Sequence, residues 1–380
     1  MKIVIAIDSF KGSMSSMEAG ESAKAGVKRV FEDSQIDVRP LADGGEGTVD
    51  AIVSACQGQT VEVKVTGPTG KTVTTPYGIV DKTHTGIIEM SGAAGITQVS
   101  GKEKNPLYTT TYGVGEVIRD AIEKGCRHFV VGIGGSATND GGVGMLQALG
   151  FDFLDENGQA IQRGAIGLKD LKTIGTENVL PQLKECSFRI ACDVTNPLCG
   201  SKGASAIYGP QKGATKEMIQ DMDQWLLNYA RLAKKRFSEA DENYPGAGAA
   251  GGMGFAFLTF LGGSLESGIK IVLEETNLRS YVKDADLVIT GEGRLDGQTV
   301  MGKAPIGVAK LAKEYGLPVL GFSGCVTEDA VACNREGIDA FFPVLRTVTS
   351  LEEALNPENA MRNMTDTVEQ VFRTIKTFRA

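Results

Sequence analysis

Hydrophobic and polar residues alternate along the chain in a pattern that predicts buried strands separated by amphipathic helices. Residues 2–7, KIVIAI, form an apolar run typical of a buried strand. Ser15 and Glu18 then make a capping box, and apolar residues at helical spacing follow. A second strand near 36–40 precedes another helix-like stretch. Because strand, polar loop and helix recur in this order, we expect the βα units of a parallel sheet.

The middle of the chain begins differently. Between about 60 and 90, apolar and polar residues alternate around GPTG, which predicts an antiparallel hairpin. The strand–helix alternation then returns, with helices expected near 112–124 and 215–239 and a strand at 188–192. The last third predicts strands in DLVIT, PVLGFS and AFFPV, with helices around 302–315, 327–335 and 359–377.

These patterns predict an α/β fold with two different α/β domains. The two ends of the chain resemble each other, so we assign residues 1–72 and 283–380 to one discontinuous domain with a mainly parallel sheet. Residues 73–282 are then a second α/β domain, inserted into the first.

Charge and composition narrow the possible partners. A net charge of −8 and an isoelectric point near 5.1 argue against a nucleic-acid partner, which requires a basic surface. No apolar run approaches the length of a membrane span, and the start, MKIVIAID, is strand-like and unlike a signal peptide. The seven cysteines include no CxxC pair, which fits reduced thiols. We therefore expect a cytoplasmic protein without a membrane partner.

Two residue types shape the expected chemistry. The chain has only two histidines, which argues against a histidine-ligated zinc site or a Ser-His-Asp triad. A metal would therefore be a hard ion on oxygen ligands, such as Mg²⁺. Glycine supplies 49 of 380 residues, about twice the usual share of roughly 7 %, and it gathers in a few loops.

Polar residues follow the expected strands, at the edge where open α/β sheets bind ligands. They are Asp8, Ser9, Lys11, Asp43, Glu46, Ser136, Thr138, Asn139, Asp140, Asp193, Thr195, Asn196, Glu292, Arg294, Asp296 and Ser323. A single Asp after a strand is usually a helix cap. Five loops that combine carboxylates with glycines and cations instead favour phosphoryl transfer, which needs positioning and electrostatic stabilisation but no histidine.

Two glycine-containing stretches need separate interpretation. GIGGSATNDGG, residues 132–142, holds five glycines between a strand and a helix, which predicts a backbone surface for an anionic group. GQTVMGKA, residues 297–304, resembles a P-loop but ends in Ala304 and follows no apolar strand directly. Lys303 is therefore either a phosphate contact or a surface lysine. In GAGAAGGMG, small residues serve either close packing or a substrate-facing helix start.

Six segments in order along essentially the whole chain resemble the bacterial glycerate kinase family. They are IAIDSFKGSMSS, PLADGGEGT, GIGGSATNDGG, CDVTNPLCG, GAGAAGGMG and TGEGRLDGQT with GKAPIGVA. The resemblance implies two different α/β domains with the active site in the cleft between them. It also implies phosphorylation of D-glycerate with ATP and Mg²⁺, which in many bacterial members gives 2-phosphoglycerate.

The resemblance also suggests site residues. Lys11 fits contact with phosphate or the glycerate carboxylate, and Arg294 fits a carboxylate clamp or a contact with the transferring phosphoryl group. Asp193 and Asp296 are candidates for proton acceptor and Mg²⁺ ligand, in either order. The further candidates for binding substrate or nucleotide are Ser9, Asp43, Gly134, Gly135, Ser136, Asn139, Asp140, Gly141, Glu292 and Lys303.

Other functions fit the same residues. The scaffold could form 3-phosphoglycerate or phosphorylate another small hydroxy acid, because a few side chains decide the acceptor. A non-catalytic sensor of phosphorylated metabolites would need the anion-binding loops but not all of the carboxylates, so Asp193 and Asp296 argue against it. The sequence gives no indication of the oligomeric state.

Overall fold

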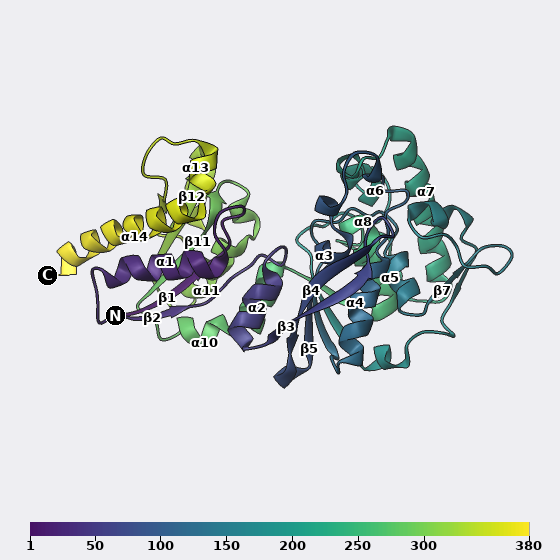
Figure 1. Ribbon diagram of the computed structural model, residues 1–380, viewed down its shortest axis with the longest axis horizontal. Coiled ribbons are helices and arrows are strands. Elements are labelled where there is room, and N and C mark those ends of the chain that lie inside the picture. Colours follow the sequence, from purple (N-terminus) through teal and green to yellow (C-terminus); the bar gives the residue numbers. More distant parts are fainter. Residues whose placement is uncertain (380) are drawn as a thin grey trace. The chain divides into compact units, whose positions relative to one another are not determined.

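The computed structural model describes residues 1–379 and divides the chain into two compact units. Of the described residues, the first unit contains 1–43, 50–56 and 269–379, and the second contains 44–49 and 57–268. Each unit is built around its own β-sheet (Figure 1). No helix within residues 1–379 is both long and apolar enough to cross a membrane.

The first unit has a five-stranded parallel sheet in the order β13-β12-β11-β1-β2. The strands are β1 (Lys2–Ile7), β2 (Gln35–Val38), β11 (Leu287–Leu295), β12 (Val319–Val326) and β13 (Ala340–Pro343). The interior strand β1 is apolar after Lys2 because both of its faces are covered, as is usual in parallel sheets.

Helices cover both faces of this sheet. Figure 1 shows α1 (Ser16–Lys28) and α14 (Pro357–Arg379) side by side, and their apolar residues share one core with Ile3, Ile5 and Ile7. The alternate residues Val4 and Ala6 are equally buried on the opposite face, and α11 (Ala304–Lys313) contacts β1 and β11. The remaining helices are α2 (Thr48–Cys56), α9 (Gly268–Glu275), α10 (Leu278–Val282), α12 (Ala332–Arg335) and α13 (Leu351–Leu355).

The second unit has a six-stranded sheet in the order β10-β9-β6-β5-β4-β3. It is parallel from β10 to β5 and antiparallel from β5 to β3. Its strands are β3 (Gln59–Thr66), β4 (Thr72–Val80), β5 (Thr85–Glu89), β6 (His128–Gly132), β9 (Ser187–Ala191) and β10 (Ser264–Glu266). The predicted hairpin is confirmed, because β3 and β4 pair from Gln59 with Ile79 to Thr66 with Thr72.

The helices of the second unit and a small two-stranded sheet complete its core. The strands of the small sheet are β7 (Asp152–Leu154) and β8 (Thr173–Gly175). The helices are α3 (Ser91–Ala94), α4 (Tyr112–Glu123), α5 (Val143–Ala148), α6 (Ala204–Tyr208), α7 (Lys216–Lys234) and α8 (Ala249–Leu261). A group of aromatic rings around Tyr229 and Phe260 packs α7 and α8 against β7.

The boundaries between the two units differ from the domain boundaries predicted from the sequence. A boundary between residues 72 and 73 would separate β3 from β4, and their backbone pairing keeps both strands in the second unit. At the other end, residues 269–282 belong to the first unit, because Arg39 of that unit stacks on the ring of Tyr281 and Ile269 packs against Gly307.

Candidate functional site

Three carboxylates lie near one another where the end of β1 lies beside β11. Asp8 and Glu292 follow Ile7 and Gly291, which are paired across the two strands, and the Asp8 N–H donates to the Gly291 carbonyl at 2.9 Å. Both side chains are buried, with only 4 % of Asp8 and 8 % of Glu292 exposed. Asp43, after β2, is close enough to raise the pKa of both carboxyl groups.

Burial controls the protonation of this carboxylate group. It raises the pKa of Asp8 to about 7, with smaller contributions from the charges of Asp43 and Glu292. The Ser9 N–H, which donates to Asp8 Oδ1 at 2.6 Å, and the exposed Lys11 act in the opposite direction. Burial also raises the pKa of Glu292. The structure therefore places Ser9, Lys11, Asp43 and Glu292 close to Asp8.

Strand β11 is longer than expected and runs on to Leu295, because it stays paired with β12. Glu292 and Arg294 consequently lie on the strand and not in the loop that follows it. Arg294 is 63 % exposed, and its Nε lies 3.2 Å from Asp296 Oδ2. Asp296 begins the loop and accepts the Gln298 N–H through Oδ1 at 2.9 Å.

The P-loop-like stretch 297–304 does connect a strand to a helix. Thr299 donates its hydroxyl to Glu292 Oε1 at 2.7 Å, and Lys303 stands at the N-cap of α11. Lys303 Nζ lies 3.8 Å from Glu292 Oε2. Lys303 is therefore half-buried beside a carboxylate, a position from which it can neutralise a nearby negative charge.

In the second unit, the glycine-rich loop 132–142 presents only part of its backbone. Gly134 and Gly135 are exposed, and Gly135 has φ = 70°. Gly141 is buried, its N–H donates to the Gly251 carbonyl at 2.9 Å, and an added Cβ would lie 2.9 Å from the Tyr229 ring. The exposed backbone available to an anion is therefore that of Gly134 and Gly135, which adjoin the buried Ser136, while Gly141 packs against the Tyr229 ring.

Asn139 and Asp140 of the same loop are buried and make hydrogen bonds within the second unit. Asp140 accepts the N–H of Thr111 at 2.8 Å, the hydroxyl of Thr111 at 2.9 Å and the N–H of Gly142 at 3.2 Å. The Asn139 amide donates to Ser205 Oγ at 2.8 Å. The hydrogen bonds of Asp140 give it a structural role that needs no ligand, whereas the Asn139 side-chain oxygen is buried without a hydrogen-bond partner among the described residues.

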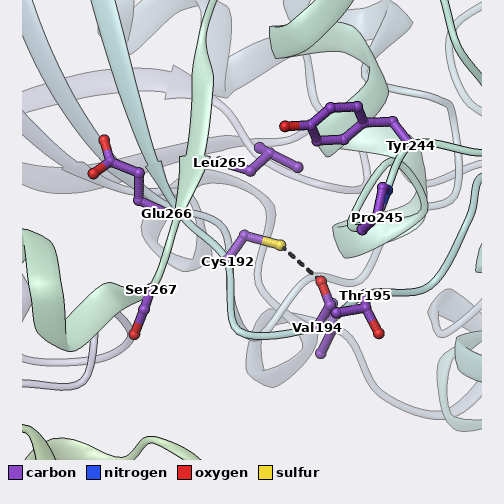
Figure 2. Close-up of a pocket in the computed structure, with 8 residues that line it drawn as sticks. All are labelled: Cys192, Val194, Thr195, Tyr244, Pro245, Leu265, Glu266 and Ser267. Carbon is purple, nitrogen blue, oxygen red and sulfur yellow. Dashed lines mark hydrogen bonds between the residues drawn. The ribbon is translucent and has the colours of Figure 1, made fainter.

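Asp193 follows β9, and its chain neighbours Cys192 and Val194 line a pocket of about 450 Å³. Figure 2 shows the residues that line this pocket. Its side chain is exposed, and its Oδ1 accepts the Gly268 N–H at 3.2 Å. The pocket is lined by Cys192, Val194, Thr195, Tyr244, Pro245, Leu265, Glu266 and Ser267. Glu266 makes two 2.9 Å hydrogen bonds with Arg189, so its charge is compensated and the pocket suits an uncharged, partly apolar group.

Two residues gain importance only in the structure. Asp8 is one of several polar residues after strands, and nothing in the sequence distinguishes its buried carboxyl group from a helix cap. Lys212, in the loop YGPQKGA, has the sequence context of a surface lysine. It is 1 % exposed, and its ammonium group donates to Ser136 Oγ at 2.8 Å and to the Thr138 carbonyl at 2.6 Å.

The predicted metal ligands Asp193 and Asp296 belong to different units of the chain. Within residues 1–379, no group of three or more His, Cys, Asp or Glu side chains is arranged to hold a metal ion. Mg²⁺ in phosphate-transferring enzymes usually takes one or two carboxylates together with the phosphates of the substrate. The oxygen donors Asp193 and Asp296 suit such an ion chemically without a preformed cluster.

Each unit thus carries polar groups after its parallel strands that suit phosphoryl transfer, namely carboxylates and cations in the first and an exposed glycine backbone in the second. The chain belongs to the Glycerate kinase family, which it matches over residues 3–376. Members of this family are kinases, so the protein is an ATP-dependent phosphotransferase.

Individual relatives match over nearly the full chain. The chain is 48 % identical to the glycerate 2-kinase of Escherichia coli K12 over 93 % of each protein. It is 46 % identical to the glycerate kinase of Bacillus subtilis 168, over 99 % of this chain and 98 % of the relative. The crystal structure of a protein assigned as glycerate kinase 2 from Salmonella typhimurium LT2 has a TM-score of 0.92 and 46 % identity, covering 100 % of this chain and 99 % of the other.

Proposed function

We propose that the protein transfers the γ-phosphoryl group of ATP to D-glycerate and forms 2-phosphoglycerate and ADP. The observation that carries this proposal is the 48 % identity, over 93 % of both chains, to a relative named glycerate 2-kinase. The site supports the same chemistry, because phosphoryl transfer depends on cations and backbone donors that stabilise charge.

The roles of the exposed charged residues follow from their chemistry. Lys11 and Arg294 are both exposed and positively charged, so each can contact a phosphoryl oxygen or the glycerate carboxylate. Lys303, at the N-cap of α11, adds a third cation beside Glu292. Gly134, Gly135 and Ser136 offer backbone and hydroxyl donors for an anionic oxygen.

Carboxylates supply the metal ligands and the proton acceptor. Either Asp193 or Asp296 would ligate Mg²⁺, which would neutralise phosphate charge when bound. Asp8 is a further candidate for the proton acceptor, because a group with a pKa of about 7 suits general base catalysis near neutral pH. Asp193 and Asp296 are the alternatives for that role, and their substitution by Asn separates metal binding from proton transfer.

The pocket beside Asp193 fits the nucleoside of ATP better than it fits glycerate. Tyr244, Pro245 and Leu265 give it apolar walls, and the Thr195 and Ser267 side chains can make hydrogen bonds (Figure 2). A small carboxylate would gain little from apolar walls, whereas a flat heterocyclic base would bury apolar area and stack on an aromatic ring.

The decisive experiment combines the purified protein with D-glycerate, ATP and Mg²⁺, follows ADP release, and assigns the product by phosphorus NMR. We expect ADP release that requires D-glycerate and a 2-phosphoglycerate signal. A 3-phosphoglycerate signal would correct the product. Turnover of another hydroxy acid in place of D-glycerate would correct the acceptor, and binding of ADP and glycerate without turnover would indicate a sensor.

A further inference from the structure

The buried Lys212 is placed directly beneath the exposed part of the glycine-rich loop. Its Nζ donates hydrogen bonds to Ser136 Oγ and to the Thr138 carbonyl. Gly134 and Gly135, which precede Ser136 in the chain, are exposed, whereas the Lys212 ammonium group is buried. Both of its hydrogen-bond partners are neutral. Among the described residues, the contacts of this ammonium group are therefore hydrogen bonds to neutral oxygens and include no ion pair with a carboxylate.

A buried ammonium group without a carboxylate partner is costly for a folded protein. The nearest negative charge that affects Lys212 is Asp140, and the oxygens of that carboxylate accept hydrogen bonds from Thr111 and Gly142. Burial lowers the pKa of Lys212 to about 7, which reflects the missing counter-charge. Such a position is understandable if the missing charge arrives with a ligand.

The contact with Ser136 fixes the direction in which that hydroxyl group can donate. In its protonated form Lys212 has only N–H donors, so Ser136 Oγ accepts in this hydrogen bond. The single hydrogen of the hydroxyl group therefore stays available to another acceptor. Ser136 adjoins the exposed Gly134 and Gly135, which places this donor at the edge of the predicted anion surface.

We propose that Lys212 is a positioning residue that holds Ser136 as a donor to an anionic ligand on Gly134–Ser136 and supplies the positive charge beneath that ligand. The ligand is a phosphate or carboxylate group, which the proposed kinase reaction supplies in both of its substrates. The inference rests on the proposed function for the identity of these substrates, but the anion site itself can be tested without turnover.

The test measures ligand binding by calorimetry, with inorganic phosphate, ATP with Mg²⁺, and D-glycerate as separate probes. The proteins compared are the wild type, K212M, S136A and the double variant. We expect K212M and S136A to weaken the same probe, K212M by about tenfold to a hundredfold, as for the loss of a charge-assisted hydrogen bond. The double variant should bind that probe no more weakly than K212M, because Lys212 acts through Ser136.

Lys184 provides the matched control, because it is an exposed lysine of the same unit and K184M removes the same charge. Unchanged binding of all three probes by S136A, or by folded K212M, would overturn the proposal. So would weakening of different probes by the two variants. If K212M does not fold, K212Q and S136A carry the test. A wild type that binds ATP but does not phosphorylate D-glycerate would refute only the proposed function.

Discussion

Replacing Asp8 by Asn should stabilise the protein at neutral and alkaline pH. Asp8 is buried, and its pKa rises from 3.8 to about 7 in the folded chain. Because the folded-state pKa is the higher one, ionisation opposes folding, and stability is lost as the pH rises from about 4 to about 7. A shift of about three units at 1.36 kcal/mol each amounts to roughly 4 kcal/mol above pH 7.

Asn is neutral at every pH and keeps an oxygen that can accept the Ser9 N–H. The free energy of unfolding of D8N should therefore match that of the wild type near pH 4 and exceed it by up to about 4 kcal/mol at pH 8. Urea unfolding at four or more pH values between 4 and 8 measures this difference directly. If Asp8 is the proton acceptor, the same substitution should lower kcat by about 10²- to 10⁴-fold.

Asp33, an exposed aspartate of the same unit, gives the matched control in D33N, whose unfolding should follow the wild type at every pH. A stability difference between D8N and the wild type that stays constant from pH 4 to pH 8 would refute the reasoning. That result would mean that the folded protein hydrates or pairs the Asp8 carboxylate well enough to keep its pKa normal.

Two further predictions separate packing from ligand contact. Gly135→Ala should cost about 1–2 kcal/mol of stability from its left-handed backbone alone, whereas Gly141→Ala should cost about 1–3 kcal/mol more, because its Cβ meets the Tyr229 ring at 2.9 Å. Urea unfolding of both variants tests this, and equal costs would contradict it. Tyr244→Ala should raise the KM for ATP about two- to tenfold and leave the KM for D-glycerate unchanged. A change in the KM for D-glycerate alone would contradict the assignment of this pocket to the nucleoside.

The elements that the sequence predicts well are those decided by neighbouring residues. The capping box of Ser15 and Glu18 is confirmed at the start of α1, and the alternation around GPTG is confirmed as the β3–β4 hairpin. Both depend on contacts within a few residues or on a side-chain period of two. The extension of β11 to Leu295 was missed because it depends on pairing with a distant strand, β12.

The candidate site is less predictable because burial separates residues that look alike in the sequence. Asp140 and Asp193 both lie in loops that follow strands, yet Asp140 is enclosed by donors from Thr111 and Gly142 while Asp193 is exposed. For Lys212 the sequence and the structure differ. Its chain neighbours are typical of an exposed surface loop, but its packing beneath loop 132–142 buries it. Tertiary contacts, not local composition, decide which polar groups remain available to a ligand.

The glycine excess has a structural explanation in the contact between two stretches of the second unit. An added Cβ on Gly251 would lie 2.1 Å from the Thr138 carbonyl, and one on Gly252 would lie 2.7 Å from the Gly141 Cα. These two backbones touch directly, and the stretch 250–252 adopts positive φ angles at the start of α8 to allow it. Packing thus requires the glycines of GAGAAGGMG and the second half of loop 132–142. It fixes the position of the first half, so Gly134–Ser136 can present a preformed surface, as an electrostatic role in phosphoryl transfer requires.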